Sequence, residues 1–248
     1  MIRGVDVSAY QPKLDYDKMR KAGCEFLIVK VTDGNHYTNR HAAAQIDGGI
    51  KSDMLVTLYH FGGPSGPASG WLADAAHEAM RLDKIADEIE QKYSRKIFTW
   101  LDLERNTALN QTEKKTWSVW ADEVRRWSRE EGQRKIGFYS GKYFTADLSL
   151  NDTWSQTLFW MAQYRKWSLD PNLYTYGFFG DTSRPPETLW WPKATSPFPR
   201  ADIWQDGGGG PGGNNATFPG VGNDGDPSDT NLFAGDRGEL EALIDAAA

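Results

Sequence analysis

The chain has 248 residues, 39% hydrophobic and 25% charged, which is enough to bury a sizeable core and favours one large domain over two ordinary ones. Its net charge of −6 argues against a surface that binds DNA, RNA or an anionic membrane. The single cysteine, Cys24, excludes an internal disulfide, and the cysteine and histidine positions have no zinc-site spacing. We therefore expect a fold that needs neither a metal nor a cofactor.

The first residues, MIRGVDVSAYQPK, contain no apolar stretch long enough for a signal peptide, and nowhere do 18 apolar residues run together. A trimmed precursor would give the same pattern. We expect a protein that is made in the cytoplasm without a signal peptide and has no membrane partner.

Short β-rich runs alternate with helical stretches along the first half of the chain. The predicted strands are 2–7, 26–31, 54–61, 97–104, 135–139, 158–164 and 202–205, and the predicted helices are 16–22, 40–50, 69–93, 112–131 and 236–246. In the helix at 112–131, Trp117, Trp120, Val124 and Trp127 recur at helical spacing. We interpret this apolar face as packing against a sheet and not as a platform for sugars.

Repeated strand and helix predicts a parallel sheet with helices outside it, and at this length a closed barrel is favoured over a doubly wound open sheet. Residues 170–199 are rich in Pro, Gly and aromatics, and a Gly-rich loop follows at 206–225. The expected fold class is α/β: a single irregular TIM-like β/α barrel over residues 1–248, with helices missing from the last three units, a (β/α)5(β)3-like arrangement.

Two acids end the predicted strand at 97–104, whose sequence is IFTWLDLE. Side chains alternate along a strand, so Asp102 and Glu104 share one face with Phe98 and Trp100, while the mostly aliphatic face would meet the helices. In a barrel this places both acids inside, at the carboxyl end of the strand where barrel enzymes carry their chemistry. One of two such close, shielded carboxyls should have a raised pKa, as a general acid requires.

Acids at a strand end also have structural explanations, because they often cap a helix or pair with a cation, and Arg105 is adjacent. A third acid shifts the balance towards catalysis. Asp6 ends the first predicted strand, on the side of Gly4 and opposite Val5 and Val7. Strands one and four would both direct carboxylates towards the barrel axis, and such a cluster of like charges is costly unless function or a cation requires it.

Seven segments occur in a fixed order: GVDVSAYQ, FLIVKVTDG, LYHF, TWLDLE, GFYSGKYF, LFWMAQY, and IWQ followed by DTNLFAG. Together they resemble the glycoside hydrolase family 25 lysozymes, the Chalaropsis-type muramidases common among phage endolysins and bacterial autolysins. The match runs from Gly4 to about Gly235. It implies an N-acetylmuramidase that cleaves the β-1,4 bond between N-acetylmuramic acid and N-acetylglucosamine in bacterial peptidoglycan.

The resemblance implies that Glu104 is the acid/base, with Asp102 as its companion and Asp6 and Asp229 as further catalytic acids. Glu104 would protonate the leaving oxygen while Asp102 orients the 2-acetamido group, whose carbonyl oxygen attacks the anomeric carbon with retention of configuration. The residues alone leave open that Asp6 or Asp229 serves a direct nucleophile or an inverting base.

Substrate binding is expected from aromatic side chains near strand ends, which cover sugar rings with little loss of entropy. By resemblance Tyr59 lines the cleft, and by position Tyr139, Tyr164 and Trp204 are candidates. For Trp154, Trp190 and Trp191, which lie in predicted loops, packing is favoured over substrate contact. Adjacent positions point oppositely on a strand, so His60 is predicted to be a core histidine and not a catalytic one.

The chain departs from the family pattern at a few positions. Tyr10 stands where Trp is frequent, Asp33 stands where Glu is common, and DTN replaces the more usual D-L-N. The segment 181–202 is longer than the family needs and would extend the cleft wall, altering which stem peptides or sugar modifications are accepted.

Three other functions compete with the muramidase hypothesis. A cell-wall amidase or endopeptidase needs a zinc site or a Cys–His pair, and neither is evident. An inactive peptidoglycan-binding barrel is disfavoured by the presence of all four acids, and a chitinase-like glycosidase by the lack of earlier spaced acids in TWLDLE. We expect an endolysin-like or exported monomer that acts on the cell wall without a separate wall-binding domain.

Overall fold

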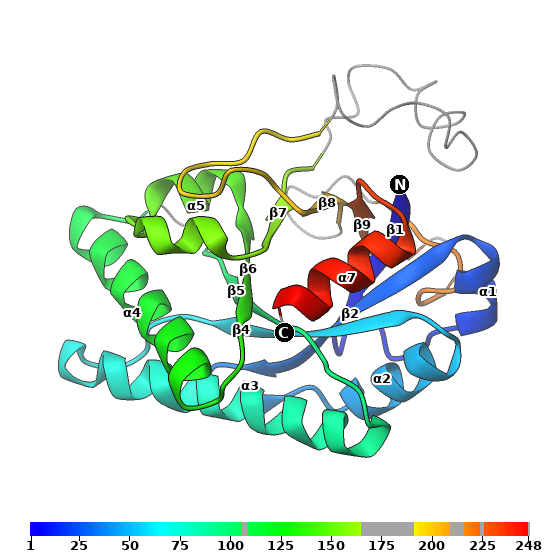
Figure 1. The fold of residues 1–248 in the computed structure, drawn as a ribbon, viewed down its shortest axis with the longest axis horizontal. Coiled ribbons are helices and arrows are strands. Elements are labelled where there is room, and N and C mark those ends of the chain that lie inside the picture. The colour runs from blue at the N-terminus through cyan, green and yellow to red at the C-terminus, as the bar shows by residue number, and fades with distance from the viewer. Residues whose placement is uncertain (106–108, 165–190, 209–215, 224–225, 248) are drawn as a thin grey trace.

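The structure is a computed structural model that describes residues 1–105, 109–164, 191–208, 216–223 and 226–247. One sheet closes on itself into an eight-strand barrel (Figure 1). A two-residue strand, β3 (Tyr37–Thr38), pairs with β2 and extends the sheet. The barrel strands are β1 (Ile2–Val7), β2 (Cys24–Asp33), β4 (Leu55–Gly62), β5 (Thr99–Leu103), β6 (Ile136–Gly141), β7 (Phe159–Ala162), β8 (Ile203–Gly207) and β9 (Asp229–Phe233).

The strand order around the barrel is β1-β9-β8-β7-β6-β5-β4-β2, and pairing of β1 with β2 closes the ring. Neighbouring strands are parallel except at β9, which runs antiparallel to both β1 and β8. The first seven barrel strands match the predicted ones, whereas β9 was not predicted as a strand. Its sequence, DTNLF, contains Asp and Asn, which are both depleted in strands, and pairing on both sides supplies the order that local propensity lacks.

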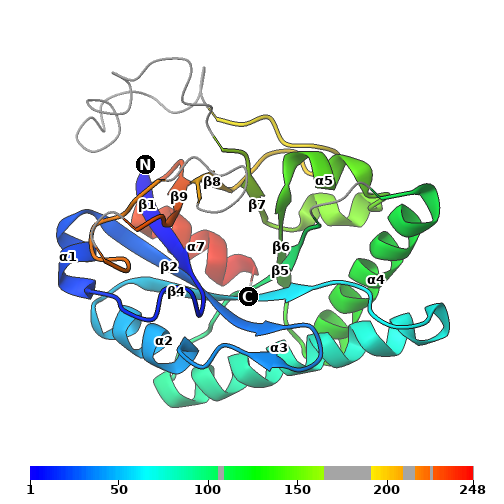
Figure 2. The ribbon, with the colours of Figure 1, turned by 180° about the vertical axis from the view of Figure 1, so that it is seen from behind.

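Helices cover the outside of the barrel, as Figures 1 and 2 show from opposite sides. They are α1 (Tyr16–Lys21), α2 (Ala42–Lys51), α3 (Trp71–Tyr93), α4 (Gln111–Glu130) and α5 (Lys142–Asp147), with 3-10 turns at η1 (Ala68–Gly70) and η2 (Asp152–Gln156). The last helix, α7 (Arg237–Ala247), lies across one end of the barrel (Figure 1). A capping box starts α4, in which Asn110 accepts from the backbone N–H of Glu113 and the Glu113 side chain accepts from Asn110. The short α5 and η2 were not predicted.

Helices thus follow strands through the first part of the barrel, and the unit after β6 carries only the short α5 and η2. Most of the connection from β7 to β8, including 165–190, lies outside the described residues. The closed eight-strand barrel with helices is confirmed, while the finer expectation about the last three units stays a prediction. Among the described helices none is long and apolar enough to cross a membrane.

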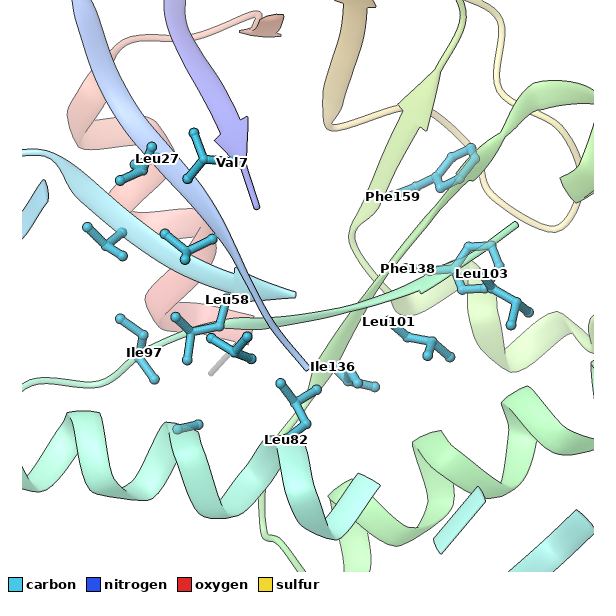
Figure 3. Close-up of a cluster of buried hydrophobic side chains, with 14 of the residues drawn as sticks. Val7, Leu27, Leu58, Leu82, Ile97, Leu101, Leu103, Ile136, Phe138 and Phe159 are labelled. Carbon is cyan, nitrogen blue, oxygen red and sulfur yellow. The ribbon is translucent and has the colours of Figure 1, made fainter. Parts of the chain in front are cut away.

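An outer core fills the space between the strands and the helices. Figure 3 shows its aliphatic and aromatic members projecting from the strands towards α3 and the neighbouring helices, with Leu82 of α3 meeting them. Trp117, Trp120, Val124 and Trp127 of α4 join this cluster, as predicted. These tryptophans therefore attach the helix to the sheet.

An inner core fills the barrel itself and is closed at one end by α7. Leu240 and Ile244 of α7 pack with Phe26 and Ile203, near the starts of β2 and β8, and with Phe98, which directly precedes β5. In Figure 1 α7, drawn in red, lies across the barrel in front of the strands. In Figure 2, seen from behind, the strands lie in front of α7. Because this end is plugged, the opposite end, at the carboxyl ends of the parallel strands, is left for a site.

Candidate active site

The acids of β5 lie on the inner face of the barrel. Trp100 belongs to the inner core, whereas Leu101 and Leu103 belong to the outer one, so the predicted alternation is confirmed. Asp102 shares the face of Trp100 and is buried, and Glu104 follows directly after the strand and is only partly buried. The strand therefore places the carboxyl of Asp102 inside the barrel and that of Glu104 at its mouth.

Asp6 and Asp229 face each other across the junction between β1 and β9, where they are directly paired in register. Val5 and Val7 belong to the outer core, so Asp6 points inward, as predicted. Residues opposite each other in an antiparallel pair have Cβ atoms about 5 Å apart. The unpredicted strand β9 thus brings the late aspartate beside the first one, although they are 223 positions apart in the sequence.

Electrostatic repulsion and burial act together on these acids. Burial raises the pKa of Asp102, and the charge of Glu104 raises it further. Burial and then the charge of Asp229 raise the pKa of Glu104 and that of Asp6. A carboxyl with a raised pKa keeps its proton at a higher pH, which is the property that a general acid needs.

A cation that the sequence prediction missed lies next to the acids. Lys30 of β2 places its Nζ 2.7 Å from Oδ2 of Asp33 and 4.5 Å from the centre of the Phe61 ring. Its positive charge lowers the pKa values of Asp102 and Glu104, against the effect of burial. A lone lysine within the apolar run FLIVKV was the available signal, because an inward charge in a barrel strand needs a partner.

Two carboxamides, also missed by the sequence prediction, hold Asp6. Its Oδ2 accepts hydrogen bonds from Nε2 of Gln205 at 2.9 Å and from Nδ2 of Asn231 at 2.7 Å. Both hydrogen bonds lower the pKa of Asp6, in opposition to burial and Asp229. The available signal was alternation along two short segments. Gln205 shares a strand face with Ile203, and Asn231 shares one with Asp229.

The aromatic candidates divide between the two faces of the barrel. Tyr59 and Tyr139 are buried on the inner face, and their rings pack against Trp160 with centroids 5.8 and 4.2 Å apart. The half-buried Tyr164 donates to Oε1 of Gln205 at 3.1 Å. Trp204, which was predicted to bind substrate, does not line the barrel. It is buried on the outer side, because the neighbouring Gln205 points inward to Asp6.

Other residues that the sequence singled out have structural surroundings. His60 lies on the outer side of β4, where its Nδ1 is 2.8 Å from the hydroxyl of Thr32 and its Nε2 is 2.7 Å from Glu78. The side chain of Trp204, on the outer side of the barrel, packs against Trp191 with ring centroids 5.8 Å apart. Trp154 is fully buried and donates to Asp122 at 2.6 Å. His60, Trp154 and Trp191 therefore serve packing, whereas Trp190 lies outside the described residues.

The longer segment 181–202 can be followed only from residue 191 onwards. Trp191 donates to the backbone oxygen of Ala201 at 2.7 Å, and Phe198 stacks on Phe159 with ring centroids 4.1 Å apart. The described end of the segment therefore packs on the outer surface of β7 and β8. The expected role in extending the cleft wall falls on residues outside the described ones.

A closed barrel with four acids gathered at one end of its axis has the layout of a barrel glycoside hydrolase. The sequence profile of Glycosyl hydrolases family 25 matches residues 5–179. That is most of the chain, and it includes Asp6, Asp102 and Glu104. This chain belongs to glycosyl hydrolases family 25.

Individual relatives match over shorter stretches. The N,O-diacetylmuramidase of Chalaropsis sp is 32% identical over 76 residues, which cover 29% of this chain and 36% of that protein. The lysozyme of Lactococcus phage mv1 is 36% identical over 103 residues, 41% of this chain and 46% of that protein. The matched regions thus span less than half the length of these two relatives.

Solved structures share the fold over nearly the whole chain. The bacterial lysozyme from Streptomyces coelicolor superimposes with a TM-score of 0.69 at 19% identity, covering 100% of this chain and 98% of that one. The catalytic domain of endolysin ply40 from bacteriophage P40 of Listeria monocytogenes gives a TM-score of 0.64 at 19% identity, covering 98% and 97%. At this level of identity the likeness establishes the fold.

Proposed function

We propose that this chain is a peptidoglycan hydrolase that cleaves the β-1,4 bond between N-acetylmuramic acid and N-acetylglucosamine. Family membership supports glycoside hydrolysis, and the names of the lysozyme and muramidase relatives support this substrate. Glu104 is the proposed general acid/base, since it lies at the mouth of the barrel with a raised pKa. A partly exposed acid at this place can reach a glycosidic oxygen that a deeper one cannot.

The observation that carries the mechanism is an unsatisfied oxygen of Asp102. Its Oδ1 is buried and has no hydrogen-bond partner within the part of the chain that the structure describes. A buried carboxylate oxygen without a donor is costly, and the N–H of a substrate 2-acetamido group is a donor of matching chemistry. Asp102 then orients the acetamido carbonyl for attack on the anomeric carbon while Glu104 protonates the leaving oxygen.

Asp6 and Asp229 complete the site as charges beside the reacting sugar. In this mechanism neither bonds to the substrate, and the product keeps the β configuration. If either acted as an inverting base instead, the first product would be the α anomer. Proton NMR of the first-formed reducing sugar distinguishes the two outcomes.

The proposed function is tested by digesting purified peptidoglycan with the protein and reducing the new ends with borohydride. We expect reduced muramic acid to accumulate, with no release of free amino groups. Reduced glucosamine would instead indicate a glycosidase of another specificity, for which chitin is the matched alternative polymer. Amino groups without reducing ends would indicate a peptidase or amidase, and neither signal would indicate a binding protein.

The cellular setting belongs to the same proposal. One relative is a phage lysozyme, and one structural neighbour is a phage endolysin catalytic domain. We propose that the protein acts on the bacterial cell wall as a monomer, after release or export from the cytoplasm. Size-exclusion chromatography with light scattering tests the oligomeric state, since a dimer mass would contradict the monomer.

A further inference from the structure

Gln205 and Asn231 meet at the bottom of the acid cluster. They are paired in register across β8 and β9, and both are buried. Each donates to the same oxygen, Oδ2 of Asp6, at 2.9 and 2.7 Å. Two strands distant in sequence from β1 therefore converge on one atom of one carboxylate.

The orientation of each carboxamide is set by a second donor behind it. The indole Nε1 of Trp160 donates to Oδ1 of Asn231 at 2.7 Å, and the hydroxyl of Tyr139 donates to Oε1 of Gln205 at 2.7 Å. An indole N–H can only donate, so turning the Asn231 amide over would place donor against donor and amide oxygen against Asp6. The NH₂ group of Asn231 must therefore face the carboxylate, and that of Gln205 faces it as well.

Tyr164 strengthens the same arrangement from the mouth of the barrel. Its hydroxyl is a second donor to Oε1 of Gln205, at 3.1 Å. Gly208 leaves room for it, because a Cβ there would lie 2.8 Å from the Tyr164 hydroxyl and 2.7 Å from Oδ1 of Asp229. Tyr139 and Tyr164, two of the three tyrosines predicted to bind sugar, thus have their hydroxyls engaged with Gln205.

We propose that Gln205 and Asn231, held by Tyr139 and Trp160, are positioning residues that fix Asp6 as an oriented carboxylate in the catalytic cleft. The proposal rests on the glycosidase function proposed above. Charged hydrogen bonds of this kind both restrict the side chain and favour the ionised form. In its ionised form, a carboxylate held in this orientation stabilises the positive charge that develops on the sugar in an oxocarbenium-like transition state.

Other ionisable groups face Asp6 from the surrounding strands, and their effects have to be kept constant in a test. They are Asp229, Glu104, Asp102, Tyr59, Tyr139 and Tyr164. A variant that removes hydrogen-bond donors without altering any carboxylate meets this requirement. Gln205→Met does so with little change in side-chain volume, and Tyr139→Phe removes one hydroxyl while keeping the ring that packs on Trp160.

The experiment measures kcat and KM on soluble peptidoglycan fragments against pH. For Gln205→Met we expect kcat to fall roughly 10- to 100-fold with KM nearly unchanged, and the acidic limb of the profile to move to higher pH. Tyr139→Phe should show the same changes at smaller size, because Tyr164 still donates to Gln205. The matched control is Tyr93→Phe, which removes a tyrosine hydroxyl bonded to Asp47 on the outer helices.

A second readout does not depend on activity. Carbon-13 NMR of labelled aspartate, with the Asp6 signal assigned by Asp6→Asn, follows the titration of this carboxyl directly. The pKa of Asp6 should be higher in Gln205→Met than in the wild type. If both variants are folded by circular dichroism and leave the Asp6 titration and the acidic limb in place, the proposal is overturned. If the wild type is inactive but the titration of Asp6 still shifts in Gln205→Met, the hydrolase function is overturned, while the clamp on Asp6, meaning the pair of hydrogen bonds from Gln205 and Asn231, stands.

Discussion

At the scale of single residues, the site is a balance between four carboxyls and one nearby cation. Burial and mutual repulsion raise the pKa values of Asp6, Asp102 and Glu104. Lys30 acts against this on the β5 acids, and the amides of Gln205 and Asn231 act against it on Asp6. The acids can thus differ in protonation although they lie in one cluster, and such a difference is what the proposed roles of proton donor and charge require.

Replacing Lys30 tests this balance. Lys30→Met removes the charge that lowers the pKa values of Asp102 and Glu104, so both values should rise. The acidic and basic limbs of the activity profile should both move to higher pH, by roughly one unit. Lys51→Met is the matched control, because Lys51 pairs with Asp47 on α2, away from the acids. A profile that stays in place would show that Lys30 does not act on the acids.

Residue patterns predicted the acids better than they predicted the residues that hydrogen-bond to them. Asp102 and Glu104 were predictable because alternation along one strand decides which side chains point inward. The clamp on Asp6 was not, because it joins residues from three strands whose order around the barrel is invisible in the sequence. For the same reason, Trp204 was assigned to the cleft from its place near a strand end, while the register of β8 turns it outward.

At the scale of elements, strong local patterns were predictable and short elements were not. The 20-residue α4 carries an apolar stripe and a capping box, whereas α5 has six residues, too few to show a helical period. The strand β9 has five residues and begins with Asp-Thr-Asn. Its strand conformation comes from pairing with β1 and β8, which is a tertiary effect.

The C-terminal helix is an element whose role can be tested separately from catalysis. Leu240 is 1% exposed and packs with the inner core at the closed end of the barrel. Leu240→Ala should lower the free energy of unfolding by about 2–5 kcal/mol, through lost burial and the cavity left behind. Urea denaturation measures this, with the exposed Asp245→Ala expected to change it by less than about 0.5 kcal/mol. If Leu240→Ala lowers the free energy of unfolding by less than about 1 kcal/mol, α7 does not close the barrel as described.

At the scale of the whole molecule, stability should depend on pH through a buried pair on the outer side of the barrel. Glu78 of α3 and His60 of β4 are both fully buried and share a 2.7 Å hydrogen bond. Burial raises the pKa of Glu78 to about 8 and lowers that of His60 to about 3. Both groups are therefore neutral near pH 7, with the Glu78 acid donating to His60 and His60 donating to Thr32.

The sign of the pH effect follows from where the unfolded chain takes up protons. Unfolded, Glu78 loses its proton near pH 4.5, so its contribution to stability falls as the pH rises from there towards 8. His60 contributes fully above pH 6.5 and loses its contribution as the pH falls towards 3. Between pH 6.5 and 8, only Glu78 of this pair weakens the fold.

Glu78→Gln isolates this effect, because an amide can donate to His60 but cannot ionise. The wild type should lose up to about 1.4 kcal/mol of stability per pH unit relative to this variant between pH 6.5 and 8. Urea denaturation at several pH values measures the difference, and Glu88→Gln, an exposed change on the same helix, is the control. Parallel curves for the wild type and Glu78→Gln would show that Glu78 is not the titrating group.

The barrel class was predictable from alternating strands and helices, and the position of the site from acids at strand ends. The antiparallel closure by β9 was not predictable, and it decides which carboxyls meet: it places Asp229 opposite Asp6. The whole arrangement then directs one acid with a raised pKa, Glu104, towards the mouth, and the central claim is that this acid cleaves peptidoglycan.

The most direct test compares the wild type with Glu104→Gln, which keeps the size of the side chain and removes its acid. New muramic-acid reducing ends are counted on purified peptidoglycan, with Glu131→Gln, an exposed change beyond α4, as the control and circular dichroism as the check of folding. We expect the wild type and the control to release such ends and Glu104→Gln to lose at least about 100-fold in rate. A folded Glu104→Gln with nearly full activity would contradict the assignment of Glu104 and with it the account of the site.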